Sequence, residues 1–231
     1  MILCCGEALI DMLPRVSQEG ELAFAPYAGG AVFNTSVALG RLGAEPGFFC
    51  GLSTDLFGEM LDAKLTEAGV SSQFAVRSSR PTTLAFVRLS DGHASYTFYD
   101  ENSALRMMTA ADLPALPDTV STLFFGGISL VGEPCGSADQ ALLAREASSR
   151  VTMIDPNIRP RLWNDPEDMR AAIMEAALSS EIVLPSFEEE AAHFGDADPQ
   201  ATVARYLSAG ATSVVVKNGA GDIHYSCGGD A

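Results

Sequence analysis

Short apolar runs alternate along most of this chain with longer stretches in which apolar positions recur at helical spacing. The apolar runs predict strands at residues 1–10, 46–52, 122–125, 151–154, 181–184 and 213–216. The longer stretches predict helices at residues 31–42, 56–68, 138–149, 166–178, 187–194 and 199–208. Strands that alternate with helices predict an α/β fold, with a mostly parallel central sheet and helices on both faces.

Two regions, at about residues 12–27 and 72–100, have β character without a helix between their strands. Within the second region, apolar runs at residues 83–89 and 94–99 flank the pair Asp91-Gly92, which is a strong hairpin signal. Antiparallel hairpins inside an α/β chain predict a small accessory sheet. We therefore interpret residues 1–231 as one α/β domain into which this sheet is inserted.

Composition narrows the class of partner. The 231 residues carry a formal net charge of −16, which argues against nucleic acid and anionic membranes as partners. Phosphate-bearing small molecules stay compatible, since glycine loops and helix ends hold phosphates locally. The five cysteines have no C-x-x-C spacing, and there is no charged leader or apolar stretch of about 20 residues. We therefore expect a cytoplasmic protein that binds small molecules.

The run from Ala28 to Gly43 carries the most specific chemistry. Gly29 and Gly30 allow a ligand to approach the backbone closely, and an apolar helical pattern follows them. Asn34 falls near the start of that predicted helix, where its amide can bind a polar ligand. Taken alone, such a turn is as often simple chain punctuation.

Two further groups of polar side chains follow predicted strands. Asp11 comes just past the apolar run at residues 1–10, and ligands of α/β sheets bind beyond the carboxyl ends of strands. Asp155, Asn157 and Arg159 alternate after residues 151–154, so an extended backbone would turn all three side chains to one side. The structural alternatives are a turn aspartate for Asp11 and a surface Asp–Arg pair for the second group.

The order of these motifs resembles the ribokinase-like (PfkB) family of carbohydrate kinases over nearly the whole chain. In chain order, the motifs that carry the resemblance are Gly6-Glu7-Ala8-Leu9-Ile10-Asp11, the glycine turn, Asp155-Pro156-Asn157-Ile158-Arg159, Pro185-Ser186-Phe187-Glu188-Glu189-Glu190 and Val214-Val215-Val216-Lys217-Asn218-Gly219. The resemblance implies a ribokinase-like fold whose β segments at about 12–27 and 72–100 form a lid over the sugar. It also implies ATP-dependent phosphorylation of a sugar, with Mg²⁺.

The resemblance assigns roles to particular residues. The residues implied to bind the sugar are Asp11, Gly29, Gly30, Asn34, Tyr96, Phe98, Arg106 and Arg159. Those implied on the nucleotide side are Asn157, Ser186, Glu189, Lys217 and Gly219, with Glu189 also expected to serve the metal ion. Ser186 stands where many relatives have asparagine, and it also suits the cap of the helix at residues 187–194.

Two sugars remain open from the resemblance. The aromatic lid and the run Asp100-Glu101-Asn102 resemble fructokinases, whereas Asp155–Pro160 and Leu184–Phe187 resemble kinases of 2-keto-3-deoxygluconate. An acidic run would repel an anionic sugar, so we favour fructose, although Arg106 and Arg159 leave the acid sugar open. The family also suggests a homodimer formed through the lid.

The family's catalytic aspartate lies in a G-A-G-D run at the start of a helix. Here Gly219-Ala220-Gly221-Asp222 follows a predicted strand and precedes another, so we interpret it as a hairpin turn. We expect the general base to lie beyond Ala231 and the 231-residue chain by itself to be inactive. A non-catalytic sugar- or nucleotide-binding relative is the alternative. A dehydrogenase would need the G-x-G-x-x-G fingerprint, which does not follow the first apolar run.

Overall fold

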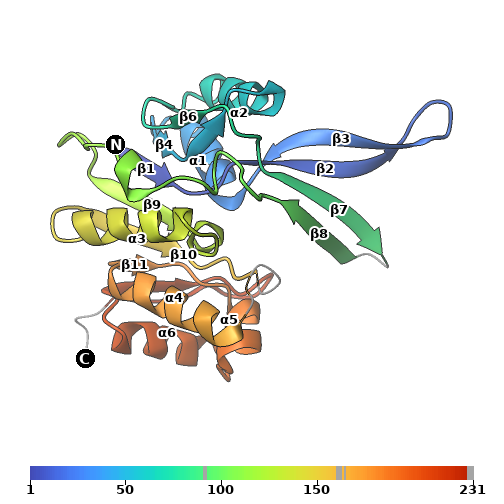
Figure 1. Ribbon diagram of the computed structural model, residues 1–231. Helices are drawn as coiled ribbons and strands as arrows, with labels where there is room; N and C mark the ends of the chain where they lie inside the picture. The colour runs from blue at the N-terminus through green and yellow to red at the C-terminus, as the bar shows by residue number, and fades with distance from the viewer. Residues whose placement is uncertain (91–92, 160–162, 164, 228–231) are drawn as a thin grey trace. The chain divides into compact units, whose positions relative to one another are not determined.

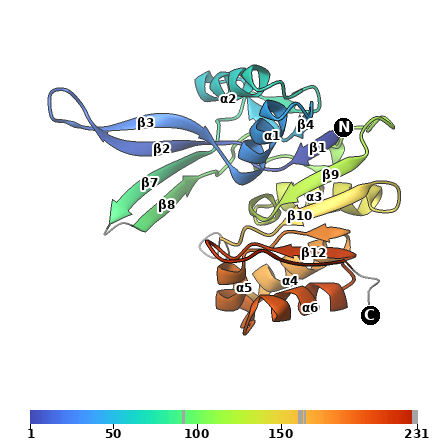
Figure 2. The ribbon, with the colours of Figure 1, turned by 180° about the vertical axis from the view of Figure 1, so that it is seen from behind.

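The computed structural model describes residues 1–90, 93–159, 163 and 165–227, and the chain divides into two compact units. The first unit comprises Met1–Gly6 and Thr109–Ala231, and the second comprises Glu7–Met108. Figures 1 and 2 trace the chain from two opposite sides.

The first unit is built on a sheet whose strands lie in the order β13-β12-β11-β10-β9-β1. Neighbours from β1 to β12 pair in parallel, and β13 pairs with β12 in the antiparallel sense. The bounds are β1 Ile2–Cys5, β9 Thr122–Gly126, β10 Val151–Asp155, β11 Ile182–Val183, β12 Ser213–Val216 and β13 His224–Cys227. The predicted α/β class with a mostly parallel sheet is therefore confirmed.

Helices and 3₁₀ turns connect these strands, as a parallel sheet requires. The elements are η1 Ala110–Asp112, η2 Gly127–Leu130, α3 Cys135–Glu146, α4 Pro166–Leu178, α5 Phe187–Phe194 and α6 Pro199–Ser208. Helix α6 packs on β12 and β13. Helix α5 contacts both α4 and α6, the three helices labelled beside one another in Figure 1. In the part of the chain that the structure describes, no helix has both the length and the apolar character needed to cross a membrane.

The parallel strands of this sheet are mostly apolar, because helices and neighbouring segments cover many of their side chains on both faces. Leu3, Leu123, Ile154 and Val183 have no exposed surface at all. Helices α4 and α6 both begin with proline behind an aspartate cap, a favourable combination at a helix start. Local sequence and burial thus favour the same elements, which is why these helices have the predicted bounds.

The second unit carries a four-stranded sheet in the order β3-β2-β7-β8. Its strands are β2 Leu9–Val16, β3 Leu22–Gly29, β7 Leu84–Ser90 and β8 His93–Tyr99. Both hairpins, β2–β3 and β7–β8, are antiparallel, and β2 pairs with β7 in parallel. The predicted accessory sheet is present, and the Asp91-Gly92 turn lies outside the described residues.

The other elements of the second unit are α1 Ala31–Arg41, α2 Leu56–Glu67, β4 Gly47–Phe49, β5 Gly51–Ser53 and β6 Val76–Ser78. Phe33 of α1 packs edge-to-face on Phe48 of β4 at 5.9 Å between ring centroids. Strands β5 and β6 pair in parallel.

Two predicted strands were wrong in their extent. The run at residues 1–10 is two strands, because Gly6 adopts a φ of 151° and separates β1 from β2. The run at residues 46–52 likewise divides into β4 and β5. At Gly51 the backbone of Ala104 comes so close that a Cβ atom would lie 2.0 Å from its carbonyl oxygen. Continuous apolar character cannot reveal such breaks, since both halves of each run are buried.

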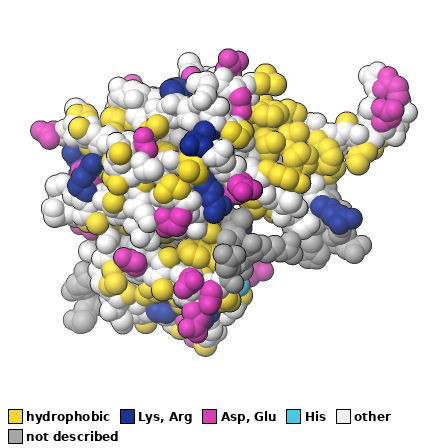
Figure 3. Space-filling view, in the orientation of Figure 1, with side chains coloured by type: hydrophobic (Ala, Val, Ile, Leu, Met, Phe, Trp, Pro, Cys, Tyr) yellow, Lys and Arg dark blue, Asp and Glu magenta, His cyan; other side chains and the backbone are white. Residues whose placement is uncertain are grey.

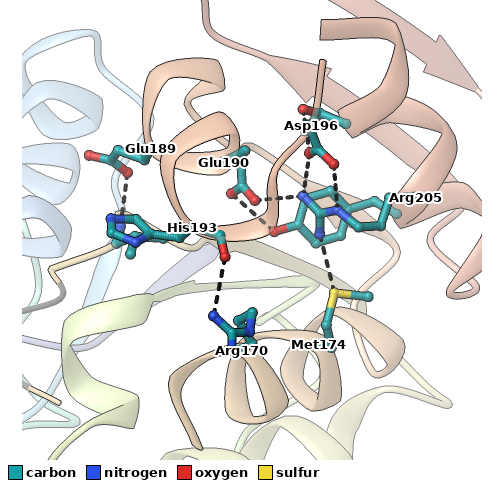
Figure 4. Close-up of polar contacts among 10 residues, drawn as sticks. Arg170, Met174, Glu189, Glu190, His193, Asp196 and Arg205 are labelled. Atoms are coloured by element: carbon teal, nitrogen blue, oxygen red, sulfur yellow. Dashed lines mark hydrogen bonds and ion pairs between the residues drawn. The ribbon is translucent and has the colours of Figure 1, made fainter. Parts of the chain in front are cut away.

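Helices α5 and α6 are joined by a buried ionic network (Figure 4). Glu190 is fully buried and accepts hydrogen bonds from Arg205 at 2.7 Å and from the Tyr206 hydroxyl at 3.1 Å. Arg205 also bonds Asp196 and lies over the Phe194 ring. Burial raises the pKa of Glu190 to about 7, although Arg205 opposes this. The carboxyl group is therefore costly to keep charged, even with its partner.

This raised pKa predicts a specific pH dependence of stability. Between the ordinary pKa of 4.5 and about 7, the folded protein binds more protons at Glu190 than the unfolded chain does. As the pH rises through that range, the free energy of unfolding of the wild type should therefore fall by roughly 2–3 kcal/mol relative to that of a Glu190→Gln variant. Denaturant titrations at both ends of the range measure this difference. The exposed neighbour variant Glu188→Gln is the control, and parallel curves for wild type and Glu190→Gln would contradict the prediction.

Candidate functional site

The first candidate residues lie where the β2–β3 hairpin meets helix α1, all within the second unit. Asp11 is the third residue of β2, opposite Tyr27 of β3 and Ala85 of β7. It does not follow the end of the first strand, as the sequence suggested, because that strand already ends at Cys5. Its position inside a sheet fixes the direction of its side chain more firmly than a loop would.

Asp11 is a half-buried acid whose carboxylate has no hydrogen-bond partner among the residues that the structure describes. Burial alone raises its pKa. Its Oδ2 atom points at Gly29, where a Cβ atom would lie only 2.2 Å away. The glycine therefore makes room for this carboxylate, which stays available for hydroxyl donors of a ligand.

Gly30 performs a second task at the start of α1. Its φ of 109° is unfavourable for other residues, and a Cβ atom there would lie 2.7 Å from the Glu7 carbonyl oxygen. Asn34 follows on the first turn of α1, is exposed, and makes no side-chain hydrogen bond within the described ranges. The expected order of glycine turn, helix start and amide is thus present in the structure.

Glu7 supports the site structurally, a role that the sequence analysis did not assign to it. Its side chain is fully buried, and Oε1 accepts the N–H groups of Ala31 at 2.7 Å and Val32 at 3.2 Å. Because glycine at the cap position has no side chain, Glu7 supplies the acceptor that a helix start needs. A lone acid inside the apolar run at residues 1–10 was the available signal.

Strands β7 and β8 place Tyr96 and Phe98 in register with β2. Phe98 lies opposite Ala85 and Tyr96 opposite Val87, and Ala85 in turn lies opposite Asp11. Because alternate strand residues share a face, Tyr96 and Phe98 lie on the same face of the sheet as Asp11. The two rings stack at 6.1 Å between centroids.

Arg106 is held by an acid. Its Nη1 donates to Asp100 at 2.7 Å, and its backbone N–H donates to Ser103. Ser103 also accepts a hydrogen bond from Thr83, which connects this segment to the start of β7. The guanidinium expected near the substrate is therefore matched in charge by Asp100.

The nucleotide-side candidates lie at the carboxyl ends of β10, β11 and β12 in the first unit. Lys217 forms an ion pair with Asp155 at 2.5 Å. Glu189 accepts hydrogen bonds from the Ile158 N–H at 2.9 Å and from Arg159 at 2.8 Å. Arg159, expected beside the sugar, is thus held among the residues expected at the nucleotide.

Three local expectations at these strand ends can be checked. Residues 155–159 are not uniformly extended, because Asn157 adopts a φ of 39°, so the argument from strict alternation was wrong. Ser186 occupies the cap position of α5, but its side chain makes no cap hydrogen bond there. Gly219, with a φ of 55°, lies in the turn between β12 and β13, so the G-A-G-D run is a hairpin turn as predicted.

The donor set can be compared with the needs of a metal ion. Among the described residues, no three or more His, Cys, Asp or Glu side chains gather where they could hold an ion by themselves. A nucleotide-borne Mg²⁺ needs only one or two carboxylates, since waters and phosphate oxygens fill its other positions. Each Glu189 oxygen accepts one hydrogen bond from the protein and keeps a lone pair, so Glu189 fits that role.

Comparison with known proteins gives one consistent picture. Residues 1–230 match the family described as pfkB family carbohydrate kinase. The chain is 51% identical over 221 residues to a fructokinase of Rhizobium leguminosarum bv. trifolii, covering 95% of this chain and 68% of that protein. It is 36% identical over 194 residues to fructokinase-1 of Oryza sativa, covering 80% of this chain and 60% of that protein.

Solved structures agree with the sequence matches. A fructokinase from Xylella fastidiosa with bound ATP superposes with a TM-score of 0.87 at 30% identity, covering 98% of this chain and 74% of that one. A fructokinase from Vibrio cholerae in its fructose, ADP and calcium ion bound form has a TM-score of 0.85 at 25% identity, covering 99% and 74%. The predicted fold family is therefore confirmed.

The Glu7 cap predicts a large effect on stability. Glu7→Ala would leave two N–H groups at the start of α1 without their acceptor, which should lower the free energy of unfolding by about 2 kcal/mol or more. Glu7→Gln keeps one acceptor oxygen and should lose less. Chemical denaturation measures both, with the exposed helix variant Glu59→Ala as control. Equal stability of Glu7→Ala and wild type would refute the capping role.

Proposed function

Because this chain belongs to the pfkB family of carbohydrate kinases, we propose that it acts in the ATP-dependent phosphorylation of a small neutral sugar, fructose. The fructokinases to which it is similar support the activity and the sugar. The observation within this chain that carries the proposal is the half-buried, unpartnered carboxylate of Asp11 beside Gly29. A partly desolvated carboxylate of this kind suits a ligand that supplies hydroxyl donors.

On the sugar side, Asp11 accepts hydrogen bonds from two hydroxyl groups, and Asn34 both donates and accepts. Gly29 and Gly30 let the sugar approach the backbone. The lid is the four-stranded sheet of β2, β3, β7 and β8, since residues 76–78 of the predicted segment 72–100 form β6, which pairs with β5 instead. On the Asp11 face of this lid, Tyr96 and Phe98 cover the apolar side of the ring.

On the nucleotide side, Asn157, Ser186, Glu189, Lys217 and Gly219 serve ATP. Mg²⁺ is the accompanying ion, and when bound it neutralises charge on the phosphates that Glu189 faces. Phosphoryl transfer depends mainly on positioning and charge neutralisation, so these residues contribute by holding the donor and the hydroxyl acceptor in fixed places. ATP as the substrate fits a cytoplasmic location.

A neutral sugar is favoured over 2-keto-3-deoxygluconate by the state of Arg106. The guanidinium that would meet a substrate carboxylate is paired with Asp100 at 2.7 Å. Asp11 adds a further negative charge to the sugar-binding face. An anionic sugar would therefore have to displace Asp100 and remain near Asp11, both of which cost free energy.

The test of this function is ligand binding followed by turnover. Titration calorimetry should show fructose binding to the wild type and at least a tenfold loss in Asp11→Ala, since the hydroxyl acceptors are removed. 2-Keto-3-deoxygluconate should bind much more weakly than fructose. Glu59→Ala, on the exposed face of α2, serves as the control. A coupled assay of ADP release, run on the full-length protein, measures phosphoryl transfer, and a protein that binds neither sugar would overturn the proposal.

The opposite face of the lid fits a second copy of this chain. Phe24, Phe86 and Tyr99 pack edge-to-face there, with Phe24 39% and Tyr99 61% exposed. Figure 3 shows hydrophobic side chains gathered over β2 and β3. An exposed aromatic cluster on a thin sheet is costly unless something covers it. We therefore infer that the protein pairs through this face as a homodimer.

Replacing this aromatic cluster should separate the copies. Phe24→Ser combined with Tyr99→Ser removes apolar area without entering the Asp11 face, so sedimentation velocity should show a monomer where the wild type shows a dimer. Tyr225→Ser is the control, since Tyr225 is a still more exposed aromatic and lies on β13, outside the lid. A wild-type protein that is monomeric at high concentration would contradict the inference.

A further inference from the structure

Residues 155–159, which begin with the last residue of β10, are held by a carboxylate at each end. At the first end Asp155 accepts the backbone N–H of Asn157 at 3.2 Å through Oδ1. Its Oδ2 atom accepts from Lys217, which follows β12. Strand β11 lies between β10 and β12, so this ion pair spans an intervening strand. The Lys217 side chain is therefore ion-paired with Asp155.

The backbone of Lys217 is also fixed. Its N–H donates to the Pro185 carbonyl and its own carbonyl accepts from the Phe187 N–H, both at 2.8 Å. These two bonds enclose Ser186, which pairs with Lys217 as an isolated bridge. The start of α5 is thus joined to the end of β12 directly through Lys217.

Helix α5 contacts the second end of the segment at residues 155–159. Glu189, on the first turn of α5, accepts the Ile158 N–H at 2.9 Å and the Arg159 guanidinium at 2.8 Å. The contacts therefore close on themselves. The strand-end ring, as we name it, runs from Asp155 to Lys217, through Pro185–Phe187 to Glu189, and back to Ile158 and Arg159.

Asn157 lies inside this ring with an uncommon backbone. Its φ of 39° is in the left-handed region, and such conformations persist where the surroundings impose them. Beneath the segment, a Cβ atom on Gly127 would lie 1.7 Å from the Pro156 carbonyl oxygen. The side-chain amide of Asn157 makes no hydrogen bond to any residue described. The ring thus constrains the backbone and leaves this amide available.

We propose that Lys217 and Glu189 are positioning residues, whose ion pairs close the strand-end ring and so present the Asn157 amide to the phosphates of ATP. This inference rests on the proposed function. It gives Lys217 an indirect role. A lysine that already neutralises Asp155 carries less net attraction for a phosphate than an unpaired one. In this role the two ion pairs of the ring fix the position of the neutral Asn157 amide.

A double-mutant cycle separates the indirect role from direct phosphate contact. If the ring positions Asn157, Asp155→Asn and Lys217→Met should each weaken ATP binding about tenfold, and the double variant should be no weaker than either. Lys217→Arg should stay close to the wild type. If Lys217 instead contacts the phosphates directly, Asp155→Asn would release Lys217, and ATP binding would be unchanged or tighter. That result would overturn the proposal.

Amide hydrogen exchange tests the ring without ATP. The Ile158 amide should exchange faster in Asp155→Asn and in Lys217→Met than in wild type, while Lys64→Met, which breaks an exposed helix pair, should change nothing. Unchanged exchange in the ring variants would overturn the ring. A wild type that binds no ATP would instead reject the proposed function and the ligand role of Asn157, and the exchange rates would still decide whether the ring exists.

Discussion

A carboxylate removed from water must find donors, and this requirement arranges the functional ends of both units. Glu7 is satisfied by the first N–H groups of α1, Asp155 by Lys217, Glu189 by Ile158 and Arg159, and Glu190 by Arg205. In each case the partner lies in a different helix, strand or loop from the acid. The contacts between these acids and their donors thus fix the relative positions of elements more specifically than hydrophobic contact alone would.

Asp11 departs from this pattern. Burial raises its pKa, and the described residues provide no donor that would offset the cost. An acid kept in that state lowers stability slightly, and the sugar that we propose as ligand would supply the missing hydrogen bonds. The neighbouring Glu7 shows the contrast, since the same type of side chain, 4 positions earlier, is fully satisfied and serves structure.

The two-residue period of a β-strand gives the four-stranded sheet of β2, β3, β7 and β8 two different faces. Asp11, Tyr96 and Phe98 share one face, and Phe24, Phe86 and Tyr99 share the other. This arrangement allows the two roles that we propose, sugar binding on one face and pairing with a second copy on the other. A shift of one residue in register would exchange the two faces, so pairing along β2 and β7 decides both roles together.

Much of the fold was readable in the sequence, because periodicity and capping act over a few residues. The helices at 166–178, 187–194 and 199–208 have the predicted bounds, and the glycine turn leads into α1 as expected. Breaks at Gly6 and Cys50 were invisible, since apolar character continues across them. Glu7 stood out as the one acid in an apolar run, but its capping role was hidden, because its partners lie 24 and 25 residues away in the chain. The sequence also does not reveal the ion pairs Asp155–Lys217 and Arg159–Glu189. Only the tertiary structure decides them, because an ion pair depends on distance in space and packing alone brings these elements together.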